Sequence, residues 1–254
     1  MPMSPRLLRP RNSLWTPAAL GTQVSAWFDA DSASTITLSG SSVSQWNDRS
    51  GSGRHVSQSV GSSQPTYATG QLNGKPAITF DGSNDRLTNT NAGSAGVDNC
   101  SFFTVARFVA GGANEDLLLG IGEGNQLKQL RSLYRASNGT TLGFATWAND
   151  LTSSAYGVDA AGSYHIFAVR QTGTSVQMRR DGLGTSYTLP SSMSSVLTSN
   201  LFLGAPHTNP ATNGVNYAAN VSFAEIVMFY SYASDATTTL VEKYLSKKWS
   251  IALS

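Results

Sequence analysis

The segment from Tyr164 to Tyr187 (YHIFAVRQTGTSVQMRRDGLGTSY) constrains the fold more than any other part of this chain. It predicts two strands joined by a tight turn around Gly173, with a second turn at Asp181-Gly182. Successive side chains of a strand point to opposite faces, and the first strand is largely apolar on both. Because a lone hairpin is only marginally stable in water, this one needs neighbouring strands and a second layer. We therefore expect the hairpin to be scaffold, with any functional site on the loops around it.

Short apolar or alternating segments, separated by turn residues, recur along the rest of the chain. Short strands with turn signals roughly every 8–12 residues indicate a β-sandwich or barrel. We expect one all-β domain over residues 23–254, since such domains often reach this size as single units. The clearest of the predicted strands are 24–29, 34–38, 75–80, 101–109, 142–147 and 221–230.

One helix is predicted, over residues 234–250. Ser234 is suited to be its N-cap, and the charge of Asp235 in the first turn suits the helix dipole. Apolar residues recur at helical spacing and form one face. They are Leu240, Val241, Tyr244, Leu245 and Trp249. We expect this face to seal an edge or an open end of the sandwich.

The composition excludes several classes of function. The hydrophobic fraction of 40% is enough for a sizeable core, and the charged fraction of 13% is low. Apart from Arg6, Arg9 and Arg11, the remaining 14 of the 17 basic residues almost balance the 15 acidic ones, which argues against nucleic-acid binding. No apolar run approaches the ~20 residues that span a bilayer, and the single cysteine excludes an internal disulfide. The N-terminus also lacks a secretion-signal core, which predicts synthesis in a cytosol.

Residues 1–22 are expected to form an extended arm. Repeated prolines before residue 18 exclude a regular helix or a central strand there, because proline lacks the backbone N–H that both need. Two interpretations remain open, a disordered leader and an arm that docks onto another protein. A disordered leader has little reason to carry a tryptophan, which favours docking. The expected docking residues are Leu7, Leu8, Arg9 and Trp15.

Four motifs occur in an order that resembles a known family. They are WFDAD from Trp27, VSQWNDRSG from Val43, PAITFDGSNDRL from Pro76, and FAEIVMF from Phe223 before a helix that ends in YLSKKW. This order is similar to the laminin-G-like, concanavalin-A-like jelly-roll domains of bacteriophage virion proteins and bacterial surface proteins. The resemblance implies two antiparallel sheets packed face to face, carbohydrate binding as the commonest activity, and virion attachment or decoration as the usual setting.

The turn inside the third motif is a candidate metal site. Asp81, Asn84 and Asp85 follow a predicted strand, and their side chains are suited to cap backbone amides of their own turn. Carboxylate and amide oxygens are also hard ligands, so calcium is the alternative interpretation. Calcium is the one cofactor that the sequence suggests.

No catalytic residues are predicted. Glycosidases need two carboxylates flanking the scissile bond, and no strand carries two acids spaced to face the same way. Glu115 and Asp116 are adjacent and so project to opposite faces, while Glu123 and Glu225 are isolated in the sequence. The three histidines lack the spacing of a zinc site. We therefore expect a protein that is not an enzyme.

Two polar loops carry side chains suited to bind a sugar. A sugar site combines aromatic faces with a few amide, carboxylate and backbone groups, and long loops are often functional. The alternative is that both loops are ordinary exposed connections. The candidate residues are Trp147, Asn149, Asp150 and Tyr156 around the first loop, and His207, Asn209, Asn213 and Tyr217 in the second.

The residues and the resemblance together predict a non-enzymatic bacteriophage virion protein, such as a fibre, an appendage or a head decoration. It would be made in the host cytoplasm and present as a homo-oligomer or in many copies. Its expected partners are other virion proteins, bound through the arm, with host-surface glycans as candidate ligands and with no nucleic acid or membrane. The first alternative is a secreted or cell-surface bacterial carbohydrate-binding module, outside the cell, and the second is a polysaccharide-degrading enzyme.

Overall fold

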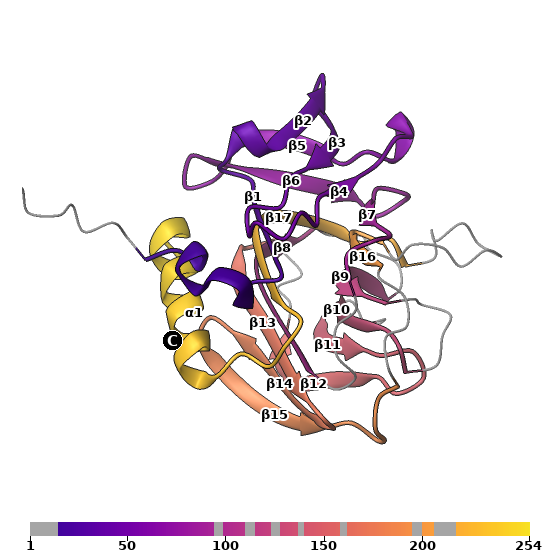
Figure 1. Ribbon diagram of the computed structural model, residues 1–254, viewed down its shortest axis with the longest axis vertical. Coiled ribbons are helices and arrows are strands. Elements are labelled where there is room, and N and C mark those ends of the chain that lie inside the picture. Colours follow the sequence, from indigo (N-terminus) through magenta and orange to yellow (C-terminus); the bar gives the residue numbers. More distant parts are fainter. Residues whose placement is uncertain are drawn as a thin grey trace, which may run out of the picture.

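The computed structural model describes residues 15–93, 99–109, 115–122, 128–136, 140–157, 162–194, 200–205 and 217–254. Within these ranges the chain forms seventeen strands, three short 3-10 helices and one C-terminal α-helix (Figure 1). All strand pairings are antiparallel, and they join into one nearly closed sheet. The predicted all-β class with a single C-terminal helix is confirmed.

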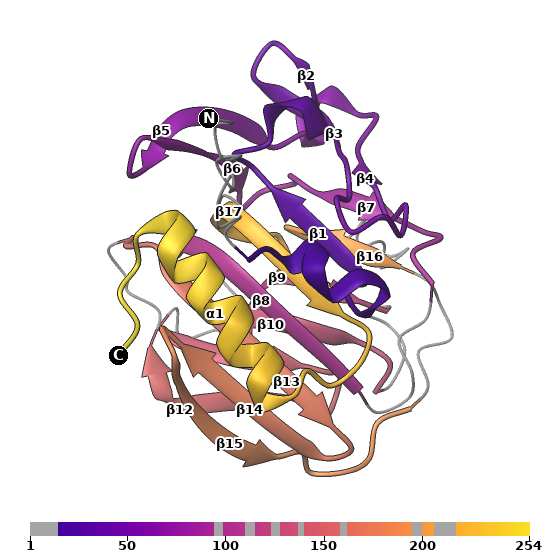
Figure 2. The same cartoon turned by 60° about the vertical axis from the view of Figure 1, so that its left-hand side comes forward.

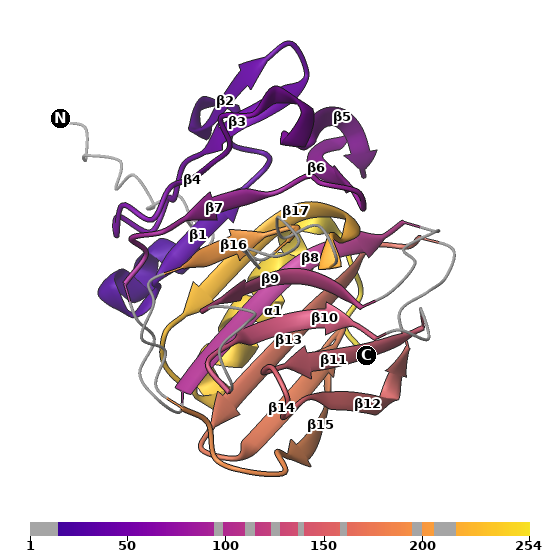
Figure 3. The same ribbon diagram turned by 90° about the vertical axis from the view of Figure 1, so that its right-hand side faces the viewer.

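The sheet folds over so that two layers face each other (Figure 3). The first layer runs, by hydrogen-bonded neighbours, β15 (Leu183–Thr188), β14 (Ser175–Arg180), β13 (His165–Thr172), β8 (Asn99–Phe108) and β17 (Asn220–Phe229), with β1 (Ala26–Asp29) and β6 (Lys75–Asp81) on the far side of β17. The second runs β12 (Leu151–Gly157), β11 (Thr141–Ala145), β10 (Arg131–Arg135), β9 (Asp116–Ile121), β16 (Leu201–Leu203), β7 (Leu87–Asn89), β4 (Val56–Ser57), β3 (Ser42–Trp46) and β2 (Ile36–Ser39). The remaining strand, β5 (Thr66–Leu72), pairs with both β3 and β6 and so connects the layers.

The main hydrophobic core fills the space between the two layers. In β13, Phe167 and Val169 point into this core, whereas Ile166 and Ala168 point to the outer face. The predicted hairpin is confirmed, with β13 and β14 joined at Gly173, whose φ is 56°. Arg170 of this hairpin is buried and ion-paired with Asp235, so it is structural.

Helix α1 (Asp235–Trp249) crosses the outer face of the first layer (Figure 2). The Ser234 hydroxyl accepts a hydrogen bond from the Thr237 amide at 3.1 Å, as an N-cap does. Val241, Leu245 and Trp249 pack on the apolar outer face of β8, β13 and β17. The expectation that the helix seals an edge or an open end is wrong, because this outer face is itself apolar and needs a cover.

One residue of the predicted apolar face of α1 does not contribute to its buried side. Leu240 is 41% exposed and does not belong to the buried face of α1. Among the described residues, no helix is both long and apolar enough to cross a membrane.

The last part of the predicted N-terminal arm is folded against the body. Residues Pro17–Gln23 form a 3-10 helix, with Pro17 at its first position, where the missing N–H costs little. The ring of Trp15 meets Tyr244 of α1 edge-on, with centroids 6.0 Å apart. Trp15 therefore anchors the chain to its own body, and an extended arm over residues 1–22 is wrong for its last part. The other expected docking residues, Leu7, Leu8 and Arg9, lie outside the described residues.

Candidate functional site

A cavity of about 220 Å³ opens on the outer face of the second layer. Alternation along β10 and β11 sends Leu133 and Phe144 into the main core, and Tyr134 and Ala145 to this outer face. There they form a small apolar cluster with Phe202, separate from the main core. The cavity is lined by Glu115, Leu117, Leu130, Ala145, Trp147, Ala148, Asp150 and Tyr217.

Two aromatic rings form one wall of this outer-face cavity. Trp147 lies in the loop between β11 and β12, and Tyr217 comes seventy positions later, just before β17. Their rings meet edge-on, with centroids 6.1 Å apart, and both are partly buried against the outer cluster. Aromatic faces beside a few polar groups are the lining that small-molecule and sugar sites share.

Two carboxylates reach the same cavity from separate strands. Glu115 directly precedes β9, and Asp150 directly precedes β12. Burial raises the pKa of the Tyr134 phenol and a hydrogen bond with Thr152 lowers it, while the charges of Asp150 and Glu115 raise it further. Asp116, the neighbour of Glu115, turns to the other face and pairs with buried Arg135. The cavity therefore gathers two acids and two aromatic rings.

The loop that holds Trp147 is strained and firmly braced. Trp147 and Ala148 both have left-handed backbone angles, with φ of 59° and 66°. Such angles cost roughly 1–2 kcal/mol for each residue with a Cβ atom. The Asn149 side chain braces the loop, because its Nδ2 donates to the Ser191 carbonyl at 2.8 Å and its Oδ1 accepts from the Ser191 amide at 3.1 Å. Strain that persists in this way is concentrated at functional sites.

The structure brings together three of the predicted sugar-binding residues, Trp147, Asp150 and Tyr217. Asn149 is buried under the loop, where it fixes the conformation of its neighbours. Tyr156 belongs to the core between the layers, and its hydroxyl lies 3.1 Å from Thr185 Oγ1. The other three candidates lie outside the described residues, namely His207, Asn209 and Asn213.

Of the three candidate calcium residues, Asp81 and Asp85 are engaged with their own turn, whereas Asn84 Oδ1 is buried without a hydrogen-bond partner. Asp81 Oδ1 accepts hydrogen bonds from the amides of Ser83 and Asn84, at 2.8 and 3.2 Å. Asp85 Oδ2 accepts one from the Asp81 amide at 3.0 Å. These are the contacts that the capping interpretation predicts. In the part of the chain that the structure describes, no group of three or more His, Cys, Asp or Glu side chains is placed to hold a metal ion.

Glu225 is not isolated in space, although it is in the sequence. It lies opposite Asp29 in the pairing of β17 with β1, and Lys248 Nζ contacts both carboxylates, at 2.8 and 2.6 Å. Glu225 is fully buried and also accepts hydrogen bonds from Trp27, Tyr244 and Trp249. With its oxygens saturated by donors, it serves to hold elements together and cannot reach a substrate.

Comparisons with known proteins find similarity in structure but not in sequence. No protein-family model and no curated protein matches the sequence. A GH54 α-L-arabinofuranosidase soaked with 4-nitrophenyl α-L-arabinofuranoside matches with a TM-score of 0.56 and 17% identity, over 82% of this chain and 51% of its own. An arabinofuranosidase complexed with arabinofuranosyl-α-1,2-xylobiose matches with a TM-score of 0.54 and 15% identity, again over 82% of this chain and 51% of its own. Trypanosoma rangeli sialidase in complex with sialic acid matches with a TM-score of 0.56 and 12% identity, over 88% of this chain and 33% of its own.

This chain thus spans about half the length of the arabinofuranosidases and a third of the sialidase. At these identities the likeness shows the shared all-β fold. The structures compared are glycan-acting enzymes, which contradicts the prediction of a non-enzymatic virion protein. The sequence argument against an enzyme assumed that both catalytic acids must lie on the same strand, and this assumption was wrong. Here Glu115 and Asp150 line one cavity although they precede different strands.

Proposed function

We propose that this chain acts on glycans and cleaves a glycosidic bond in the outer-face cavity. One observation carries the proposal: two carboxylates and two aromatic rings, from three separate segments of the chain, line a single cavity. Support also comes from the fold, which resembles arabinofuranosidases and a sialidase. At about 220 Å³ the cavity is smaller than the ~300–1,000 Å³ pockets that take drug-sized ligands, so it suits one sugar residue.

The two carboxylates would divide the work as glycosidase pairs do. Hydrolysis needs one carboxyl group to protonate the leaving oxygen and a second to act as nucleophile or as base toward water. Asp150 Oδ1 accepts a hydrogen bond from the Thr146 amide at 2.6 Å, which fixes the position of that oxygen. We assign Asp150 the nucleophile or base role and Glu115 the role of proton donor. Trp147 and Tyr217 would bind the sugar ring.

The jelly-roll topology belongs to this proposal as well. Two antiparallel layers enclose the apolar core, and the second layer carries the cavity on its outer face. The sequence motifs resemble concanavalin-A-like domains, in which two such layers are expected. We propose the same arrangement for this chain.

Release of reducing ends or of an aryl leaving group tests the catalytic roles. The first substrates are an aryl α-L-arabinofuranoside, a sialoside and a panel of neutral and acidic polysaccharides. Glu115→Gln and Asp150→Asn should each lower kcat by roughly 100-fold or more, as expected when a general acid or base is lost. Both variants should keep substrate affinity. Asp235→Asn is the matched control: Asp235 is an exposed acid that pairs with Arg170 on the first layer, and the variant should keep wild-type activity once circular dichroism has shown that it is folded.

Binding distinguishes an enzyme from a module that binds without cleaving. Trp147→Ala should weaken binding of the same glycan about tenfold, because it removes an aromatic wall worth roughly 1 kcal/mol or more. Cleavage that survives both acid substitutions would overturn the assignment of the pair. Binding that depends on Trp147 without any cleavage would leave the cavity as a lectin-like site.

A further inference from the structure

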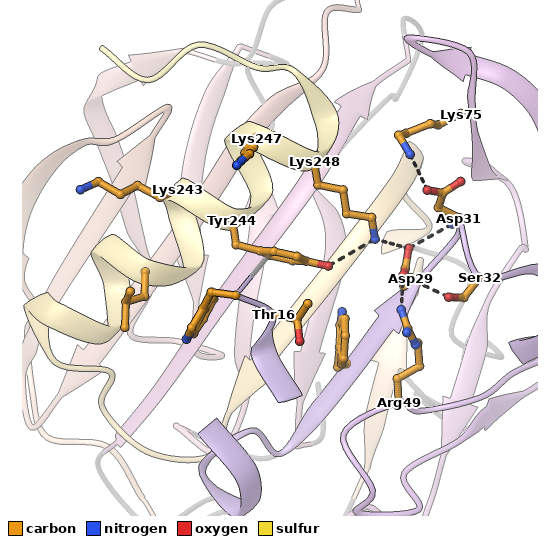
Figure 4. Close-up of a pocket in the computed structure, with 13 residues that line it drawn as sticks. Thr16, Asp29, Asp31, Ser32, Arg49, Lys75, Lys243, Tyr244, Lys247 and Lys248 are labelled. Atoms are coloured by element: carbon orange, nitrogen blue, oxygen red, sulfur yellow. Dashed lines mark hydrogen bonds and ion pairs between the residues drawn. The ribbon is translucent and has the colours of Figure 1, made fainter. Parts of the chain in front are cut away.

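A second and larger cavity, of about 650 Å³, lies on the opposite side of the molecule, beside α1 (Figure 4). One wall of this cavity is the face of α1 that carries Lys243, Tyr244 and Lys247. Residues of β1 and of the segment before the first 3-10 helix line other parts of the cavity. Its size falls within the range of sites that hold ligands of several rings. The outer-face cavity lies beyond the main core, on the second layer, so the two cavities share no lining residue.

The charges in this α1 cavity are not balanced. The acids are Asp29 and Asp31 in the lining and Glu225 beneath it, whereas the cations are Arg49, Lys75, Lys243, Lys247 and Lys248. Arg49 and Lys248 pair with Asp29, and Lys248 also contacts Glu225. Lys75 pairs with Asp31. This leaves two cations in excess.

Lys243 and Lys247 are the unmatched cations. They lie one helical turn apart on α1, both are exposed, and the described part of the chain gives neither an ion pair. Lys247 lies in the last turn, where a cation also stabilises the helix dipole. That effect falls off within one turn, so it does not account for Lys243.

The cavity also offers apolar ring surface next to these cations. Trp15 and Tyr244 are partly buried, meet edge-on at 6.0 Å, and both line the cavity. Trp27 lies below them and is nearly fully buried, with the Arg49 guanidinium stacked over its ring at 4.2 Å. A ligand therefore meets two half-exposed rings and, beside them, two lysines.

We propose that the α1 cavity binds an acidic glycan, with sugar carboxylates on Lys243 and Lys247 and ring faces against Trp15 and Tyr244. Carboxylates satisfy ammonium groups, and the apolar faces of sugar rings suit the aromatic wall. Two unmatched cations are too few for a polyanion such as nucleic acid, which is held by extended basic clusters. The site is separate from the proposed catalytic cavity and does not depend on its chemistry.

Calorimetric titration with a galacturonic acid oligomer tests the proposal. The same oligomer, reduced at its carboxyl groups, is the neutral reference. The wild-type protein should bind the acidic oligomer at least fivefold more tightly than the reduced one, and raised salt should narrow the difference because it screens exposed charges. The double variant Lys243→Gln, Lys247→Gln should bind the acidic oligomer roughly tenfold more weakly, since each exposed ion pair contributes up to about fivefold.

Two further variants separate the possible results. Arg86→Gln removes one positive charge outside the cavity lining and should leave affinity unchanged, whereas Trp15→Ala removes part of the aromatic wall and should weaken binding of both oligomers. Equal affinity for the acidic and the reduced oligomer would overturn the proposal. So would acidic binding that persists in the lysine double variant but is lost in Trp147→Ala, because the oligomer would then sit in the outer-face cavity. Failure of hydrolysis at Glu115 and Asp150 would leave these binding results unaffected.

Discussion

At the scale of single residues, the loop between β11 and β12 concentrates backbone strain in Trp147 and Ala148. Glycine adopts left-handed angles freely, so Ala148→Gly should relieve the strain of one residue. We expect it to raise the free energy of unfolding by about 0.5–1 kcal/mol, measured by urea denaturation, after the greater entropy of glycine in the unfolded chain is subtracted. Ala68→Gly in β5, where φ is not left-handed, should lower that free energy by a similar amount. Equal destabilisation by both substitutions would show that the loop is unstrained.

A second residue-scale prediction concerns Asp85. Burial, and then the charge of Asp81, raise the pKa of Asp85 from 3.8 to about 6, although the hydrogen bond from the Asp81 amide acts in the opposite direction. The folded protein therefore holds this proton more tightly than the unfolded chain. The contribution of Asp85 to stability is fully present below about pH 4 and is lost as the pH rises through about 6.

Asp85→Asn cannot ionise and should remove this dependence on pH. Relative to the wild type, its free energy of unfolding should rise by roughly 1–2 kcal/mol between pH 4 and pH 7. Chemical denaturation at the two pH values measures the change. Ser83→Ala is the control, since Ser83 is an exposed residue of the same turn that carries no ionisable group, and the effect of the substitution should stay the same at both pH values. A constant difference between Asp85→Asn and the wild type would contradict the assigned shift.

Single residues also show where sequence reasoning stopped. An aromatic residue followed by amide and acid groups marked the loop of Trp147 and Asp150 as a candidate sugar site. Glu115 was dismissed because its partner was sought on the same strand, whereas Asp150 comes from another. Asn149 and Tyr156 looked equally suitable, yet both side chains point inward. Spacing along one segment does not reveal which strands lie side by side.

At the scale of elements, Glu225 fastens α1 and β1 to β17. Its oxygens accept hydrogen bonds from Trp27 of β1 and from Tyr244 and Trp249 of α1, at 2.6–2.7 Å. Glu225→Gln would turn an amide N–H₂ toward donors and leave Lys248 with less charge to pair with. Breaking a buried pair in this way costs about 3–5 kcal/mol, and we expect a loss of that size in the free energy of unfolding. Asp31→Asn, which breaks an ion pair of intermediate exposure, should cost less than about 1 kcal/mol at the same pH.

The elements themselves were largely visible in the sequence. Alternation in the hairpin from Tyr164 to Tyr187 and helical spacing from Val241 to Trp249 predicted β13, β14 and α1 where they occur. The position of α1 was missed, because the apolar outer face of β8 and β17 becomes a surface only after the strands pair. The strand and helix patterns are local, whereas the surface that α1 covers is assembled from segments far apart in the chain.

At the scale of the whole molecule, two layers around one core leave two outer faces, each with its own cavity. The outer-face cavity combines an acid pair with aromatic rings, and the α1 cavity combines unmatched lysines with aromatic rings. The apolar core lies between them, and they share no lining residue.

Independence of the two faces is itself testable. Free-energy changes from distant sites without shared partners add to within about 0.3–0.5 kcal/mol. Trp147→Ala should therefore leave the affinity for the galacturonic acid oligomer unchanged, and Lys243→Gln with Lys247→Gln should leave hydrolysis unchanged. The triple variant should lose as much unfolding free energy as the two sets lose separately, measured by urea denaturation. A coupling above about 1 kcal/mol would mean that the layers transmit strain through the core, and the two cavities would then have to be treated as one site.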